Sequence, residues 1–400
     1  MKTLDPKKLC SISIIVLLTG FIWSGFAADD PDDLLDWYLE TGSLEFADKL
    51  REGFPGSPHA AFCDAWEYMG ANDEKARELA SALVQDHPDF AHGHFALATI
   101  LTIGFNEYAE AIPIFDRSIE ILPDFMLSYQ YRGIAKIGLV DYPGAKEDFN
   151  KVLKLKRGYA EGFLLRGVAN HELGDEEAMK ADFEIGLQLN YMALAAIPGD
   201  LAKGAIDKAI ETAPENAIYY YARGYSNFVK GNYRPASQDF NKCIELVTGN
   251  SDFYKYSGAS KIQIDNFEGG QKDLNYALSI NPDDPEIYYY LGVLMNDHIK
   301  QPAMAQEYMN HAIQLDEYNA LYYYERSKAA FKMLDYDQAR DDINMALKLD
   351  HRRGDFYAQR GNVKMKMGDP ADDYCPDFRK ALEWGTSYNL KRVMKKSCRE

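Results

Sequence analysis

The chain has 400 residues, of which 46% are hydrophobic and 26% are charged, and its formal net charge is −18. This balance suits a soluble protein and disfavours nucleic acid as a partner, because binding to phosphates requires Lys and Arg. Either solubility or a preference for basic partners explains the acidity.

Residues 1–27 have the layout of a secretory signal peptide. Lysines precede an uncharged apolar run from Leu9 to Phe26, and Gly25 and Ala27 stand at the two positions that must be small for cleavage. The apolar run is also long enough for an uncleaved membrane anchor, which is the alternative. Both interpretations predict that the rest of the chain is exported.

Residues 28–190 are predicted to form a first group of paired helices, and the clearest pair spans 126–157. Apolar and small residues recur there at helical spacing twice, on either side of a turn. Gly133 and Ala145 are small where the two helices come close, and Phe149 fills the seam between them. A lone pair cannot bury its apolar faces, so further copies are required.

Further copies follow in register, since moving forward 34 residues from Gly133 reaches Gly167. The small residues continue as Gly224, Gly258, Gly292, Ser327 and Gly361, and the seam residues as Phe183, Phe240, Leu274, Met309, Ile343 and Phe378. This period, with its small, small, large apolar and proline pattern, resembles the tetratricopeptide repeat (TPR) family. The resemblance implies an all-α, right-handed TPR solenoid of about ten helix-turn-helix units.

The remaining stretches follow from the same register. Residues 191–216 hold a unit that is 11 residues short. They are either the place of a kink or subdomain boundary, or a tolerated deletion. Residues 217–385 are predicted to form regular units, with one-residue insertions near Lys300 and Asp373. Residues 386–400 are predicted to form a capping helix over the last apolar seam.

Two cysteines lie close to the C-terminal end. Cys375 is expected in the second helix of the last unit and Cys398 at the end of the capping helix, and this ending resembles that of many exported TPR proteins of Gram-negative bacteria. In an oxidising compartment the pair is expected to form a disulfide that clamps this end. Cys63 and Cys243 are expected to be buried small hydrophobes.

An arginine before the small first-helix residue is repeatedly matched by an aspartate before the seam residue. We interpret this pattern as a ladder of structural ion pairs, because a planar guanidinium meets a carboxylate with two hydrogen bonds. A catalytic carboxylate would not need so many copies. The expected pairs are Arg132 with Asp148, Arg166 with Asp182, Arg223 with Asp239, Arg326 with Asp342, and Arg360 with Asp377.

Aromatic residues occupy two sets of first-helix positions. The set that lies four residues before the small residue is expected in the core: Tyr129, Phe163, Tyr220, Tyr254, Tyr288, Tyr323 and Tyr357. The TPR resemblance implies that a second set lines the concave groove and contacts a bound peptide; the alternative is packing against neighbouring helices. That set is Tyr221, Tyr225, Phe228, Tyr289, Tyr324 and Phe331, with Lys255, Asn296 and Lys328 as polar contacts.

The sequence contains no set of residues with the roles of nucleophile, base and stabilising group, and no metal-ligand or phosphate-loop spacing. We therefore expect no enzyme, metal or cofactor. The expected function is a protein-interaction scaffold in the periplasm or envelope, which binds a peptide segment or helix of a partner in the groove. Two alternatives are an accessory or regulatory subunit that docks a basic partner through its acidic surface, and carbohydrate binding by the groove aromatics.

Overall fold

The computed structural model describes residues 30–198, 200–386 and 390–398. The predicted signal peptide, residues 1–27, lies outside these described residues. The chain forms two compact units, one ending at Gly231 and the other beginning at Asn232, and each is described by itself. The described residues form helices and no strand, and none of those helices has both the length and the apolar character needed to cross a bilayer.

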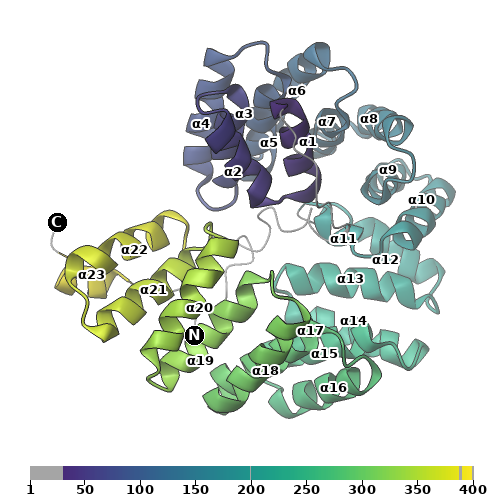
Figure 1. The fold of residues 1–400 in the computed structure, drawn as a ribbon. Helices are drawn as coiled ribbons and strands as arrows, with labels where there is room; N and C mark the ends of the chain where they lie inside the picture. The colour runs from purple at the N-terminus through teal and green to yellow at the C-terminus, as the bar shows by residue number, and fades with distance from the viewer. Residues whose placement is uncertain (1–29, 199, 387–389, 399–400) are drawn as a thin grey trace. The chain divides into compact units, whose positions relative to one another are not determined.

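Helical pairs build the first unit (Figure 1). The two helices of a pair pack together, and the second also packs against the first helix of the following pair. The helices are α1 (Pro31–Thr41), α2 (Leu44–Gly53), α3 (Pro58–Glu67), α4 (Asp73–Asp86), α5 (Ala91–Ile100) with the π-helical turn η2 (Leu101–Phe105), α6 (Tyr108–Ile121), α7 (Met126–Gly138), α8 (Tyr142–Leu155), α9 (Ala160–Glu172), α10 (Glu176–Leu189), α11 (Ala193–Ala196), α12 (Lys203–Thr212) and α13 (Ala217–Val229).

The second unit has the same construction. Its helices are α14 (Tyr233–Leu246), α15 (Ser251–Gln263), α16 (Phe267–Ile280), α17 (Pro285–Val293) with the π-helical turn η3 (Leu294–Ile299), α18 (Pro302–Leu315), α19 (Ala320–Lys332), α20 (Tyr336–Leu349), α21 (Gly354–Met367), α22 (Ala371–Glu383) and α23 (Lys391–Ser397). We call the surface formed by α15, α17, α19 and α21 the first-helix face of the second unit. The corresponding face of the first unit is formed by α1, α3, α5, α7 and α9.

Helix spacing reproduces the sequence period. Helices α7 and α9 begin 34 residues apart, at Met126 and Ala160, and α15 and α17 do the same at Ser251 and Pro285. The structure therefore confirms the predicted all-α fold of stacked TPR-like units within each compact unit.

Close packing at the seam explains why glycine recurs. A Cβ atom built on Gly133 would lie 2.6 Å from a ring carbon of Phe149, and one on Gly167 would lie 2.6 Å from a ring carbon of Phe183. Both rings are fully buried. Because real Cβ atoms do not approach so closely, only glycine lets the two helices keep this separation while the ring fills the seam.

Short polar side chains fix the turns inside the pairs. Asp141 accepts a hydrogen bond from the Gly144 amide at 3.0 Å where α8 begins, and Asp335 does the same for Gln338 at 3.1 Å where α20 begins. Each bond satisfies a backbone N–H that the helix itself leaves unpaired. The sequence thus sets where second helices start.

Two first helices absorb an extra residue by widening their last turn into a π-helix. The residue after η2 is Asn106 and the residue after η3 is Lys300, and both have left-handed backbone, with φ of 58° and 64°. The insertion expected near Lys300 therefore lies in η3. In the last pair, α21 has 14 residues and ends at Gly368, whereas α19 has 13, so the extra residue expected near Asp373 lies earlier.

The shortened unit keeps a helical pair, in which the first helix is reduced to the single turn α11. Leu194 and Ile197 from this segment, and Ile206 from α12, are buried in the core of the first unit. The boundary between the two compact units follows Gly231, after α13, and does not coincide with residues 191–216.

The C-terminal helix α23 packs on the last pair, where Leu390 is buried and Val393 and Met394 contact the core of that pair. The structure joins Cys375 in α22 to Cys398 beyond α23 by a disulfide, with their Cα atoms 5.7 Å apart. The other two described cysteines, at positions 63 and 243, are buried thiols.

Candidate functional site

The arginine–aspartate ladder joins the two helices of a pair. Arg166 donates from Nε and Nη2 to the two carboxylate oxygens of Asp182, at 3.0 and 2.7 Å. The partner of Arg223 in the first unit is Asp207, at 2.6 Å, while Asp239 belongs to the second unit. These contacts hold the scaffold together and leave no carboxylate open for chemistry. The same two-bond contact joins Arg132 to Asp148, Arg326 to Asp342 and Arg360 to Asp377.

The same arginines reach the preceding pair. Arg166 Nη1 donates to Asn150 at 2.9 Å, and its guanidinium lies 5.5 Å from the ring centre of Phe163. Rings stacked in this way lie at the outer edge of the repeat. The prediction that these aromatics are core is therefore wrong for six of the seven positions, which are half-buried, and holds only for Tyr357.

Three predicted groove residues belong to the first unit, on α13. Tyr221 is 3% exposed, Tyr225 is 7% exposed and Phe228 is half-buried. The Tyr221 ring lies 4.7 Å from the ring of Tyr191. The prediction that the two tyrosines are open to a peptide is wrong, because helical spacing identifies their face of the helix but not the side chains that pack on it.

Lys255 on α15 is also predicted to contact a partner, but carboxylates of its own unit surround its ammonium group. Its Nζ lies 2.8 Å from Asp284, 2.9 Å from Glu286 and 3.0 Å from Asp252, and the side chain is 6% exposed. Burial opposes the charged form, but the three carboxylates raise the pKa of Lys255 above its ordinary value. The residue links α15 to α17, so the prediction that it contacts a partner is wrong.

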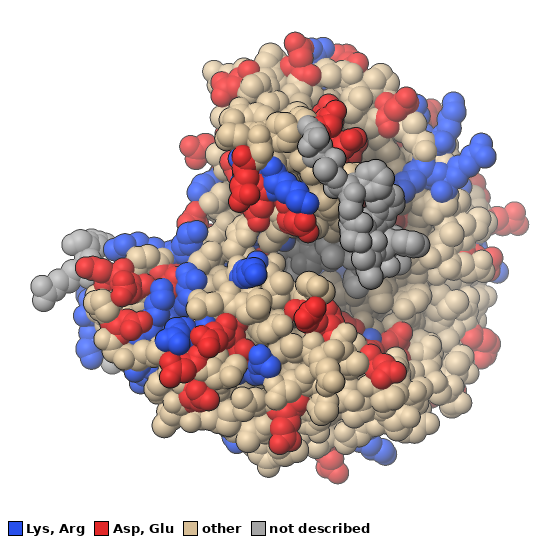
Figure 2. Space-filling model, in the orientation of Figure 1, with Lys and Arg blue, Asp and Glu red and all other residues tan. Residues whose placement is uncertain are grey.

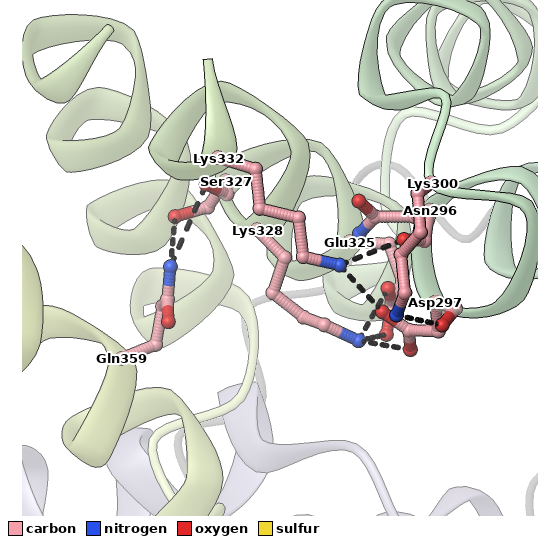
Figure 3. Close-up of polar contacts among 8 residues, drawn as sticks. All are labelled: Asn296, Asp297, Lys300, Glu325, Ser327, Lys328, Lys332 and Gln359. Carbon is pink, nitrogen blue, oxygen red and sulfur yellow. Dashed lines mark hydrogen bonds and ion pairs between the residues drawn. The ribbon is translucent and has the colours of Figure 1, made fainter. Parts of the chain in front are cut away.

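Figure 3 shows a second polar network, in which two ammonium groups from α19 converge on η3. Lys328 Nζ lies 2.8 Å from Asp297 and 2.8 Å from Glu325, and Lys332 Nζ lies 2.9 Å from Asp297 and donates to the Asn296 carbonyl at 2.8 Å. Burial disfavours ionised Asp297, but the two lysines hold its pKa below the ordinary value. Two cations balance two carboxylates, so the network carries no net charge.

The side-chain amide of Asn296 differs from the groups around it. The residue is 1% exposed, and neither its amide nitrogen nor its amide oxygen has a hydrogen-bond partner among the described residues. Leaving such a group unpaired costs about 1–3 kcal/mol. It lies in η3, and π-helical turns of this kind are frequent at functional sites.

Two predicted groove tyrosines lie around this network, and one predicted phenylalanine does not. Tyr324 is half-buried, with Lys328 Nζ 5.4 Å from its ring centre. Tyr289 is half-buried as well; burial raises the pKa of its phenol, and the nearby charge of Lys328 opposes that shift. Phe331 packs edge-on against Tyr336 of the second helix, 5.5 Å away. The structure thus brings Tyr289, Tyr324 and Lys328 together and places Phe331 in the seam.

The second unit therefore has a candidate site on its first-helix face, formed by Tyr289, Asn296, Tyr324 and Lys328. Figure 2 shows acidic and basic side chains interspersed over the visible surface, with uncharged surface between them. In the described part of the chain, no group of three or more His, Cys, Asp or Glu side chains is arranged to hold a metal ion. The site can offer aromatic surface and hydrogen bonds.

No protein-family model and no curated protein matches this chain in sequence. The solved structure of the APC/C hetero-tetramer Cut9–Hcn1 is similar at 12% identity and a TM-score of 0.47, covering 92% of this chain and 95% of that one. Yeast Tom70 is similar at 15% identity and a TM-score of 0.44, covering 92% and 93%. YrrB, described as a TPR protein with an unusual peptide-binding site, is similar at 18% identity and a TM-score of 0.27, covering 53% and 97%. We infer no partner for this chain from these likenesses.

Proposed function

We propose that this chain is a noncatalytic protein-interaction scaffold of the bacterial envelope that binds an extended segment or a helix of a partner protein. The binding surface is the first-helix face of the second unit. The observation that carries the proposal is the pair of half-buried tyrosines, Tyr289 and Tyr324, which lie around Lys328 beside the unpaired amide of Asn296.

The two tyrosines suit this function because each has an apolar ring and a polar tip. Such residues contribute much of the affinity at protein interfaces while losing little conformational entropy. Burial already restricts both rings before binding, so a partner segment meets a surface whose side chains are largely ordered. The first helices that carry the tyrosines, α17 and α19, pack against each other.

The polar network supports the choice of partner. Lys328 and Lys332 are neutralised by Asp297 and Glu325, so neither an acidic nor a basic segment is favoured by net charge. A peptide backbone offers both a donor and an acceptor, which match the amide oxygen and nitrogen of Asn296. We therefore propose a segment with uncharged apolar side chains, held by backbone hydrogen bonds and ring contacts.

Export to the envelope is part of the proposal. The signal-like residues 1–27 support it, and the proximity of Cys375 and Cys398 agrees with an oxidising compartment. A disulfide formed there would fasten α23 to the last pair.

The test is a cross-linked pulldown of the exported chain from an envelope extract, comparing wild type with the Tyr289→Ala/Tyr324→Ala double variant. The double variant is expected to lose the captured partner, because both rings are removed from the surface. The matched control is Tyr318→Ala, since Tyr318 is 77% exposed in the turn between α18 and α19. Equal recovery by wild type and the double variant would refute the proposed surface.

A further inference from the structure

Helix α1 carries a stripe of carboxylates on the first-helix face of the first unit. Asp32, Asp36 and Glu40 are spaced by four residues, which places them on one side of the helix. Their side chains remain 74%, 66% and 67% exposed. The opposite side of α1 packs the buried residues Leu34, Leu35, Tyr38 and Leu39 into the core.

Each carboxylate of the stripe faces a different later part of the unit. Asp32 lies 2.7 Å from His59 Nε2 on α3, and Glu40 lies 3.3 Å from Lys156 Nζ in the loop after α8. Asp36 lies 3.9 Å from the Nε2 atom of a buried histidine, His92, on α5. The stripe therefore lies along the first-helix face and is opposed by one lysine and two histidines.

Negative charge is in excess along this stripe. Burial, followed by the charges of Asp32 and Glu40, raises the pKa of Asp36, as expected for carboxylates that repel one another. His92 is neutral at physiological pH, because burial lowers its pKa to about 4. Like charges spaced by four residues destabilise a helix by a few tenths of a kcal/mol, so the stripe does not serve the folding of α1.

The second observation is the unpaired nitrogen of His92. The side chain is 6% exposed, and Nε2 has no hydrogen-bond partner among the described residues. At 3.9 Å from Asp36 it is too far for a direct hydrogen bond. An N–H group can lie about 2.9 Å from both atoms at once. With Nε2 as the acceptor, one ammonium or guanidinium group would satisfy the histidine and neutralise the carboxylate.

Aromatic rings surround this position. The His92 ring lies 4.6 Å from the ring of Phe125 and 5.3 Å from that of Phe90, and both phenylalanines are half-buried. Farther along the face, Lys156 lies over the ring of Tyr159 at 5.6 Å, which shows that the face already holds one cation against an aromatic ring. Carboxylates beside aromatic faces form a suitable site for cations, above all for guanidinium groups.

We propose that the first-helix face of the first unit is a second binding site, which takes an arginine- or lysine-containing segment of a partner protein between Asp36, Glu40 and His92. Charge complementarity selects this occupant. The site is separate from the tyrosine surface of the second unit, and it does not depend on the function proposed there.

The test measures fluorescence anisotropy of the full chain with a labelled peptide of alternating arginine and glycine. The comparison peptide carries citrulline in place of arginine, which keeps the shape and removes the charge. The arginine peptide is expected to bind at least about tenfold more tightly at low salt and to weaken as salt is raised. Equal binding of the two peptides would overturn the proposal.

Variants locate the site. Asp36→Asn with Glu40→Gln is expected to weaken the arginine peptide by about tenfold or more. The control pair Asp337→Asn with Asp341→Asn removes the same charge at the same spacing from α20, where the side chains are 79% and 71% exposed; it should leave binding nearly unchanged. If the control weakens binding as much as the α1 pair does, the attraction is general and the proposal fails.

Two further measurements separate the alternatives. His92→Phe keeps the ring and is expected to weaken the arginine peptide although the net charge is unchanged; retained affinity would remove His92 from the site. Tyr289→Ala/Tyr324→Ala should leave the peptide bound, which distinguishes this site from the tyrosine surface. If spermidine competes with the same affinity as the peptide, the stripe binds small polycations and the proposal of a protein segment is overturned.

Discussion

Replacing Arg326 with methionine is expected to destabilise the second unit by about 3 kcal/mol, because it leaves the Asp342 carboxylate buried without a counter-charge. Arg326 donates two hydrogen bonds to Asp342, at 2.9 and 2.7 Å, and a third to Asn310 in the preceding pair at 2.8 Å. Asp342 is 2% exposed. Among the described residues, Arg326 is the one cation within ion-pair distance of it.

The magnitude follows from the asymmetry between breaking and replacing a buried ion pair. Removing one partner of such a pair costs about 3–5 kcal/mol, whereas exchanging both for apolar residues of similar volume is close to neutral. We take the lower end because Arg326 is 18% exposed and water can reach its end of the pair. Arg326→Met combined with Asp342→Leu should therefore recover most of the loss.

Urea unfolding followed by far-UV circular dichroism measures the effect. The matched control is Arg340→Met on α20, because Arg340 is 41% exposed and pairs with the exposed Asp337 at 3.2 Å; such a surface pair contributes about 0–1 kcal/mol. Stacked repeats do not always unfold in one step, so hydrogen exchange of the α19 and α20 amides reports the local stability independently.

A loss from Arg326→Met no larger than that from Arg340→Met would refute this reasoning. It would mean that the Asp342 carboxylate is solvated or protonated at little cost in the variant. A double variant that is less stable than Arg326→Met would contradict the same argument, because it would show that the aspartate contributes something other than a stranded charge.

Three further predictions concern packing, the C-terminal end and pH. Gly133→Val should lower the free energy of unfolding by about 1–3 kcal/mol through overpacking, whereas Gly53→Ala, with nothing within 4 Å of the added carbon, should not move the urea midpoint; equal midpoints would argue against a tight seam. Serine at both Cys375 and Cys398 should lower thermal stability by about 3 kcal/mol, given their separation of 23 residues; alkylation of both thiols in untreated exported protein would show that no bond forms. His92 is buried and neutral, with its pKa lowered from 6.5 to about 4, so stability should fall as pH drops through that window, where the unfolded chain binds the proton first. His92→Gln should flatten this part of the profile, and an unchanged slope would contradict the prediction.

The fold could be predicted because it is determined by contacts inside one repeat. Gly133 and Phe149 lie 16 residues apart, and every copy of that spacing repeats the same close approach. The ladder could be predicted for the same reason, since Arg166 and Asp182 are also 16 residues apart. The second contact of Arg166, to Asn150, was open to discovery from the sequence, because it lies 16 residues in the other direction.

The sites could not be predicted so well, because they depend on residues far apart in the chain. Helical spacing places Lys255 on a particular face, but it does not reveal that Asp284, 29 residues later, accepts from its ammonium group. The carboxylate stripe on α1 is visible as a spacing of four, whereas the proximity of Glu40 to Lys156, 116 residues away, arises only when the pairs stack.

The π-helical turn η3 has a consequence for how such an array can change. An α-helix rotates by about 100° per residue, so an added residue in a regular helix would turn every later side chain onto another face. The widened turn confines that rotation between Leu294 and Ile299, and α19 begins with its ion pairs and seam residues aligned. Length variation is thereby tolerated at this position, where new side chains such as Asn296 can enter the surface without disturbing the repeats that follow.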